Sequence, residues 1–564
     1  MSSPTASPGN KGPTRRDFLA MSAGAVAAAG LAEPLPGASR TAGQPAPAHP
    51  PKNPSPPARE AKVRAARPRS RRPNLLVLMA DHVGENFIAP ESQCLKPNLD
   101  RLAAEGMRFS RCYTPTGMCS PARASLMTAT YASTHGVWDC THTQRPEWVD
   151  VSPRLSHWAH RLTEAGYRAG YFGKWHLTQS TRLEDYGWQE YEIERSVSAR
   201  GGRIPGSEVV ARKEGYRDVV LAAVRRDDQE AAHHPAYDLG IDFIRRHARN
   251  QEPFCCFVST AEPGSSNPPK RFFARYNAKE TRLPASLRDD LADKCEIHRR
   301  MQAVWREVSD EDWRKIITCY LAQLTFVDNQ VGRILQVLQD AGRYEDTIIV
   351  FLADHGQMLG AHGLAGLGLG LAFEEVYRVP LIVRLPEGIL GGSANLRGRV
   401  ISDALVSLVD VGPTLLDFCG LPPLPQAQGR SLRPLADGSG NPADWQDAYG
   451  EFFAQRFMYT QRIVWHGHWK YVFSPGGVDE LYDLAGDPCE RKNLAADPRY
   501  HERLVAMAQR MWRTMARIGD ESLLDSEYLT LRTAPIGPQS LREQPGIGAT
   551  TDCRSANSLP CSIP

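Results

Sequence analysis

The chain has 564 residues, of which 41% are hydrophobic and 23% are charged. This composition is typical of a globular protein and excludes a chain that is disordered throughout. The net charge of +3 is unevenly distributed, because residues 1–72 carry +9 and the remaining residues therefore carry −6. An acidic body of this kind has no basic stripe for nucleic acid, so we expect no nucleic-acid partner.

The N-terminal segment has the features of an export signal. Residues 14–19 contain Arg15-Arg16 and resemble a twin-arginine motif, and the apolar stretch that follows is too short for a comfortable membrane span. We therefore expect residues 1–32 to direct export through the twin-arginine machinery to the periplasm or the outside of the cell. An uncleaved signal that remains as a membrane anchor is the alternative. Residues 33–72 contain ten prolines and are predicted to be a disordered linker.

Residues 73–437 are predicted to form an α/β domain. Short apolar runs at 75–79, 167–172, 254–258 and 347–352 are typical of buried strands in a parallel sheet. Helical patterns at 97–105 and 313–341 lie between these runs. Alternating strands and helices predict a large, mostly parallel sheet sandwiched by helices. In such sheets a ligand binds beyond the carboxyl ends of the strands.

Polar residues follow the predicted strands at the point where each one ends. Three pairs do so: Asp81 and His82, Lys174 and His176, and Asp354 and His355. Carboxylates together with imidazole are suitable ligands for a divalent cation such as Ca²⁺, Mg²⁺ or Mn²⁺. Two residues that lie two apart on extended backbone share one face. Lys174 and His176 are therefore expected to bind an ester oxygen and to protonate a leaving group.

The segment 119–128 reads Cys-Ser-Pro-Ala-Arg-Ala-Ser-Leu-Met-Thr and is predicted to open a helix. We expect Ser120 to be its N-cap and Pro121 its first helical residue, because both residue types are favoured at those positions. A helix start offers free backbone N–H groups and a partial positive charge to an anion. With Cys119 as a nucleophile and Arg123 in the first turn, the segment predicts a site for a sulfate-like or phosphate-like group.

The character of the sequence changes after about Asp437. Residues 463–471 and 480–484 are predicted to be short antiparallel strands, and residues 503–518 have the pattern of an amphipathic helix. These elements predict a smaller α+β domain over residues 438–525. Residues 526–564 have little periodicity and are predicted to be a C-terminal tail.

The pattern Cys-x-Pro-x-Arg at 119–123, followed by Thr128, resembles the signature of the type I, formylglycine-dependent sulfatases. Further matches occur in the same order as in that family, at residues 96–103, 173–176, 353–356, 374–381, 469–471 and 480–484. The resemblance implies an alkaline phosphatase-like fold and a hydrolase that releases sulfate from a sulfuric ester. Its substrate would be a small-molecule or carbohydrate sulfate ester.

The resemblance also implies roles for the residues identified above. Cys119 would be converted to formylglycine by a formylglycine-generating enzyme. One hydroxyl of the hydrated aldehyde would attack sulfur, and the second would expel sulfate. The metal ligands would be Asp81, Cys119, Asp354 and His355, with His82 as a further candidate and Ca²⁺ as the first expectation for the ion. Arg123, Lys174 and His176 would support the sulfate and the formylglycine.

Three positions depart from the family pattern. His82 stands where relatives often carry a second Asp or an amide, Gly264 where many have a histidine, and Leu367 where many have a sulfate-binding lysine. Losing one such donor typically costs roughly 3–4 kcal/mol of transition-state stabilisation. His142, Gln357 and His362 are the candidates to replace the missing groups. These departures leave two other functions open: a phosphodiesterase or phosphonate monoester hydrolase, and a degenerate binding protein without activity.

Overall fold

The computed structural model describes residues 72–141, 151, 155–193, 206–212, 220–225, 233–264, 267–366, 370–391, 396–454, 458–475 and 477–524. The predicted export signal, nearly all of the predicted linker, the tail after residue 525, His142 and Leu367 lie outside these residues. The described residues belong to one compact unit. No helix among them is long and apolar enough to cross a membrane. The boundary predicted after Asp437 stays a prediction.

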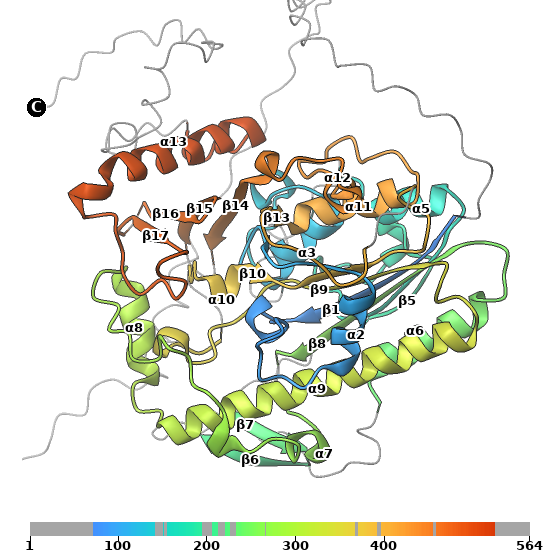
Figure 1. Cartoon of the computed structure of the whole chain (residues 1–564), viewed down its shortest axis with the longest axis horizontal. Helices are drawn as coiled ribbons and strands as arrows, with labels where there is room; N and C mark the ends of the chain where they lie inside the picture. The colour runs from blue at the N-terminus through green and yellow to red at the C-terminus, as the bar shows by residue number, and fades with distance from the viewer. Residues whose placement is uncertain are drawn as a thin grey trace, which may run out of the picture. The chain divides into compact units, whose positions relative to one another are not determined.

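An eight-stranded sheet forms the centre of the described part (Figure 1). Its strands, in spatial order, are β12 (Arg399–Ile401), β2 (Met107–Phe109), β11 (Leu381–Arg384), β9 (Thr347–Ala353), β1 (Asn74–Asp81), β8 (Phe254–Pro263), β4 (Arg168–Gly173) and β5 (Glu190–Ile193). Strand β11 runs antiparallel to both of its neighbours, and every other adjacent pair is parallel. The predicted mostly parallel sheet is thus confirmed.

Both faces of the sheet are buried, which explains why its strands are apolar without alternation. In β1, Leu75 and Val77 face one hydrophobic core, whereas Leu76 and Leu78 face the other. The first core is closed by α3 (Cys119–Thr128), α5 (Trp158–Glu164) and α11 (Val411–Phe418). The second is closed by α2 (Pro97–Glu105), α6 (Pro235–His247) and α9 (Asp310–Asp340). The two helical layers lie on opposite sides of the sheet (Figure 1).

The predicted elements of this part agree with the structure to within a few residues. The four predicted strands correspond to β1, β4, β8 and β9, and α2 covers the same residues as the helix predicted at 97–105. The predicted helix 313–341 corresponds to α9, whose N-cap Ser309 accepts a hydrogen bond from the backbone N–H of Asp312. The sequence did not indicate two smaller sheets. One has three strands, in the order β10 (Arg378–Val379), β3 (Cys112–Tyr113) and β13 (Val406–Ser407), and the other pairs β6 (Ser207–Arg212) with β7 (Val220–Arg225).

A four-stranded antiparallel sheet forms the C-terminal part. Its strands are β14 (Asp447–Ala454), β15 (Met458–His466), β16 (Trp469–Phe473) and β17 (Glu480–Asp483), and α13 (His501–Ile518) packs on it (Figure 1). The single strand predicted at 463–471 is wrong, because the chain turns at Gly467, whose φ is +58°. Glycine adopts this left-handed conformation at no steric cost, so β15 and β16 form a hairpin. The smaller α+β part itself is confirmed.

Gly356, in the loop after β9, packs closely against the backbone of Gly84 and Glu375. A Cβ at Gly356 would lie 1.9 Å from the carbonyl oxygen of Glu375 and 3.0 Å from the Cα of Gly84. Both neighbours are backbone atoms, so we expect Gly356→Ala to lower the free energy of unfolding by about 1–3 kcal/mol. Gly486→Ala is the matched control, because its Cβ would lie 3.6 Å from the nearest atom. Equal denaturation midpoints for the two variants would contradict this packing.

Candidate active site

Parallel strands bring the predicted site residues to one edge of the central sheet. Asp81 is the last residue of β1, Asp354 and His355 follow β9, and Lys174 follows β4. Asp81, Asp354 and His355 are at most 3% exposed, and Lys174 is 6% exposed. The side chain of His82 is 18% exposed, so it is the member of this group most open to solvent.

Cys119 enters the same cluster from the first residue of α3. Its Sγ lies 3.1 Å from Nε2 of His355 and 3.7 Å from Nε2 of His82. The predicted cap is wrong: Met118 is the N-cap, so Ser120 and Pro121 are already the second and third residues of the helix. Pro121 remains compatible with this position, because residues in the first turn have no intrahelical partner for an N–H group. The shift brings Cys119 itself into the first turn.

Cys119 is only 5% exposed, and part of its cover comes from distant segments. It packs with Met118, Cys140 and Phe452 of β14. Cys140 hydrogen-bonds the thiol; although burial opposes ionisation, this bond and the charges of Lys174 and His355 hold the pKa of Cys119 well below its usual range. The lowered pKa favours the thiolate, which is the form that binds a metal or acts as a nucleophile. Sequence reasoning missed Cys140 and Phe452, because nothing local in either segment indicates contact with Cys119.

The donor atoms at this edge suit a metal ion. Single ligand atoms of Asp81, His82, Cys119 and His355 lie within 4.8 Å of one another. The carboxylate of Asp354 adjoins them: its Oδ1 lies 3.8 Å from Nε2 of His355 and accepts the backbone N–H of that residue at 2.9 Å. The structure thus brings together all five residues that the sequence predicted as metal ligands.

Arg123 is buried among the strand ends and does not face solvent. Its Nε donates to Oδ2 of Asp354 at 2.8 Å, and Nη2 lies 3.3 Å from Oδ1 of Asp81. Nη1 donates to Oγ of Ser259 at 2.8 Å and to the carbonyl of Lys174 at 2.9 Å. Each guanidinium nitrogen therefore has a protein partner, and Arg123 orders the carboxylates around it. Ser259 is a further residue that the sequence did not single out.

Charges of opposite sign set the protonation of the cluster. Burial, together with Asp354 and Cys119, raises the pKa of Asp81 to about 6 although Lys174 acts in the opposite direction. Burial lowers the pKa of His355, but Asp354 and Cys119 outweigh it and raise the value to about 9. Nζ of Lys174 donates to Oδ1 of Asp81 at 2.7 Å. The site thus gathers anionic and cationic groups that are stable only together.

Lys174 and His176 do not lie on extended backbone as predicted. His176 has a φ of +50°, which is the left-handed region, and Gly173 before them has a φ of +103°. This turn, rather than strand alternation, brings His176 into hydrogen-bond contact with Cys119. Both residues therefore reach the cluster, by a route that the sequence did not indicate.

The departures from the family pattern have structural correlates. A Cβ at Gly264 would lie 3.0 Å from Oδ2 of Asp81 and 3.1 Å from Cγ of His82, so the His82 ring adjoins the space of a side chain at 264. His362 is held elsewhere, with Nδ1 2.6 Å from Oδ2 of Asp289 and its ring stacked on Phe373. It does not join the cluster in the described part. Gln357 approaches indirectly, as a hydrogen-bond partner of Tyr320, whose hydroxyl donates to the carbonyl of His82.

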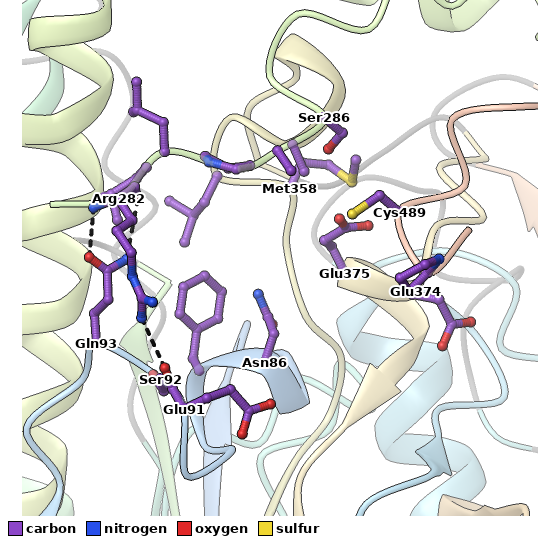
Figure 2. Close-up of a pocket in the computed structure, with 18 of the residues that line it drawn as sticks. Asn86, Glu91, Ser92, Gln93, Arg282, Ser286, Met358, Glu374, Glu375 and Cys489 are labelled. Carbon is purple, nitrogen blue, oxygen red and sulfur yellow. Dashed lines mark hydrogen bonds between the residues drawn. The ribbon is translucent and has the colours of Figure 1, made fainter. Parts of the chain in front are cut away.

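A cavity of about 440 Å³ adjoins the loops after β1 and β9. Figure 2 shows Arg282 and Gln93 on one side of it and Glu375, Met358 and Cys489 on the other. None of the cluster residues lines this cavity, so it is separate from the site of Cys119.

Comparison with protein families identifies this arrangement. The family model described as Sulfatase matches residues 73–421, and the one described as N-sulphoglucosamine sulphohydrolase, C-terminal, matches residues 367–517. The uncharacterized sulfatase YidJ of Escherichia coli (strain K12) is 30% identical over 469 residues, which cover 80% of this chain and 88% of YidJ. The N-acetylglucosamine-6-O-sulfatase of Bacteroides thetaiotaomicron is 26% identical, covering 82% of this chain and 90% of that enzyme.

Solved structures share the fold. One, in complex with its substrate D-glucosamine-2-N,6-O-disulfate, has a TM-score of 0.65 at 22% identity and covers 81% of this chain and 100% of its own. The phosphonate monoester hydrolase from Silicibacter pomeroyi has a TM-score of 0.66 at 24% identity and covers 80% and 96%, respectively. Because the Sulfatase model spans more than half of the residues and YidJ is 30% identical over most of them, the chain belongs to the sulfatase family and is a sulfatase of the alkaline phosphatase-like superfamily.

Proposed function

We propose that this sulfatase hydrolyses the sulfate ester of a carbohydrate through a formylglycine made from Cys119, with a divalent cation beside it. The observation that carries the proposal is the position of Cys119 in the first turn of α3, 3.1 Å from His355 and within 4.8 Å of donor atoms of Asp81 and His82. The N-acetylglucosamine-6-O-sulfatase and the protein bound to D-glucosamine-2-N,6-O-disulfate support the carbohydrate class.

The donor set fits a divalent cation held by Asp81, His82, His355 and residue 119, with Asp354 next to them. Carboxylates suit Ca²⁺, Mg²⁺ and Mn²⁺, whereas imidazole nitrogen favours the transition metals, so Mn²⁺ satisfies both kinds of ligand. When bound, such an ion neutralises an anion and polarises a sulfate oxygen. Ca²⁺ remains the expectation if His82 turns away.

Residues of this chain have distinct tasks in the proposed reaction. Arg123 and Lys174 hold the carboxylate of Asp81 through the contacts described above. His176, in contact with residue 119, is placed to give a proton to the departing alkoxide. The first turn of α3 directs free backbone N–H groups and a partial positive charge towards an anion at residue 119. Formylglycine at this position would supply a hydroxyl nucleophile in place of the thiol.

The residues around Cys119 also suit other tetrahedral anions, and the chain shares its fold with a phosphonate monoester hydrolase. A phosphodiesterase or phosphonate monoester hydrolase is therefore the first alternative function. The second alternative is a binding protein without turnover. It is suggested by Gly264 and by Leu367, which lies outside the described residues, because many relatives have a histidine and a sulfate-binding lysine at these positions. Parallel assays of sulfate esters, phosphodiesters and phosphonate monoesters on the matured protein separate the three. A much higher kcat/KM for the sulfate ester than for the phosphodiester and the phosphonate monoester supports the proposal. The opposite order supports the first alternative, and no turnover of any substrate supports the binding protein.

Export through the twin-arginine route is a further part of the proposal, with Arg15-Arg16 as its basis. A folded protein that already contains formylglycine can use this route, so the maturation enzyme would act before export. The test is cell fractionation of the full chain and of the Arg15→Lys/Arg16→Lys variant. The variant is expected to accumulate inside the cell, and an unchanged periplasmic or extracellular share would contradict this route.

The nucleophile generates the first prediction on activity. Chain coexpressed with a formylglycine-generating enzyme is expected to show, by peptide mass spectrometry, an aldehyde in place of the thiol at residue 119. Cys119→Ala should lower turnover by a factor on the order of 10⁵, because residues that act as a unit lose nearly all activity together. Cys489→Ser, outside the cluster, is the control and should keep full turnover. An unmodified Cys119 in the active protein would refute the formylglycine.

The metal generates the second prediction. Treatment of the matured enzyme with a chelator should abolish turnover, and Mn²⁺ should restore it at a lower concentration than Ca²⁺ if His82 is a ligand. His82→Ala should reduce this preference for Mn²⁺, with His355 as the remaining imidazole, whereas the exposed control His468→Ala should keep it in full. Full turnover after chelation would exclude a required metal, and equal Mn²⁺ and Ca²⁺ requirements in the parent enzyme would exclude His82 as a ligand.

A further inference from the structure

A second cavity, of about 360 Å³, lies between α13 and the segments around Arg430 and Asp447. Figure 1 shows α13 crossing the C-terminal sheet at the side where β13 and β14 approach the central part. Tyr131 also lines the cavity and comes three residues after the end of α3. Because α3 has ten residues and begins at Cys119, its length of about 15 Å separates the cavity from the catalytic residue.

Four guanidinium groups line this cavity, and two of them have no protein partner. Arg510, Arg513 and Arg517 project from one face of α13, at positions three and four residues apart. Arg510 is paired with Asp447 at 2.8 Å. Arg513 and Arg517 make no hydrogen bond or ion pair with any residue that the structure describes. Arg430 is fixed by stacking, with its guanidinium carbon 3.5 Å from the ring centroid of Trp445.

The described carboxylates in the cavity make no ion pair with Arg513 or Arg517. Asp447 is already shared by Arg510 and by Nδ1 of His466 at 2.8 Å. Asp410 accepts the backbone N–H groups of Ser407 at 2.8 Å and of Arg430 at 2.9 Å. Asp444 is the remaining carboxylate, at an exposed position on the rim. The positive charge of Arg513 and Arg517 is therefore available to a ligand.

The hydroxyl of Tyr131 adds a hydrogen-bond donor to the same cavity. Tyr131 is 7% exposed, and its ring meets that of Tyr449 edge to face at 5.4 Å. Its hydroxyl makes no hydrogen bond with a described residue although it belongs to the lining of the cavity. The hydroxyl is therefore free to donate a hydrogen bond to a ligand in the cavity.

We propose that this cavity binds a tetrahedral oxyanion, namely a sulfate group, between Arg513, Arg517, Arg430 and the hydroxyl of Tyr131. Guanidinium groups match the oxygens of such an anion in geometry and charge, which makes their hydrogen bonds to it strong. The anion has two possible sources with the same chemistry: free inorganic sulfate, and a second sulfate group of a polymeric substrate. The inference does not depend on the formylglycine or on the metal.

The test is calorimetric titration of the full chain with inorganic sulfate at constant ionic strength. The parent protein is expected to bind one equivalent more than the Arg513→Gln/Arg517→Gln variant. Tyr131→Phe should keep this additional equivalent but bind it several-fold more weakly, since one donor is lost. Arg503→Gln is the matched control on α13, because Arg503 lies over Trp469 and not in the cavity. It should bind as the parent does.

Two further measurements make the result decisive. Product inhibition by sulfate reports on the catalytic residues and should be unchanged in the Arg513→Gln/Arg517→Gln variant. A KM that rises for a sulfated polysaccharide but not for a sulfated monosaccharide identifies the polymer as the source, and two unchanged KM values identify free sulfate. The proposal is overturned if the double variant, with an unchanged melting temperature, binds as many equivalents of sulfate as the parent does.

Discussion

The guanidinium of Arg123 is enclosed by strand ends that come from separate parts of the chain, and it donates to groups on all of them. Burying a charge in this way is favourable only when its partners are in place, and removing one partner typically costs about 3–5 kcal/mol. The side chains of Asp81, Asp354, Cys119 and Lys174 therefore depend on one another. The central sheet must be in register for any of them to be stable.

Much of the fold follows from residue patterns that act locally. The buried strands are uninterrupted apolar runs and α9 has an amphipathic pattern, so β1, β9 and most of α9 were predictable. Prediction failed where a single backbone angle decided the outcome. The left-handed Gly467 divides an apparent strand into a hairpin, and the helix of Cys119 begins before the residues best suited to cap it. In both places the tertiary structure overrides local preference.

The candidate site was predictable to the extent that it lies at strand ends. Asp81, Lys174 and Asp354 follow apolar runs, and parallel pairing brings them together. Ser259 and Cys140 were not predictable, because each acquires its role only by contact with a residue more than twenty positions away. The left-handed turn at His176 was also hidden, since histidine in this conformation leaves no pattern in the sequence.

Phe452 has a consequence for the order of events during synthesis. It covers Cys119 from β14, a strand that leaves the ribosome only after the whole central sheet has been made. Until β14 docks, the thiol lacks part of its cover and is open to an enzyme, and afterwards it is 5% exposed. Docking of the C-terminal sheet thus limits the time during which another protein can reach the side chain of residue 119.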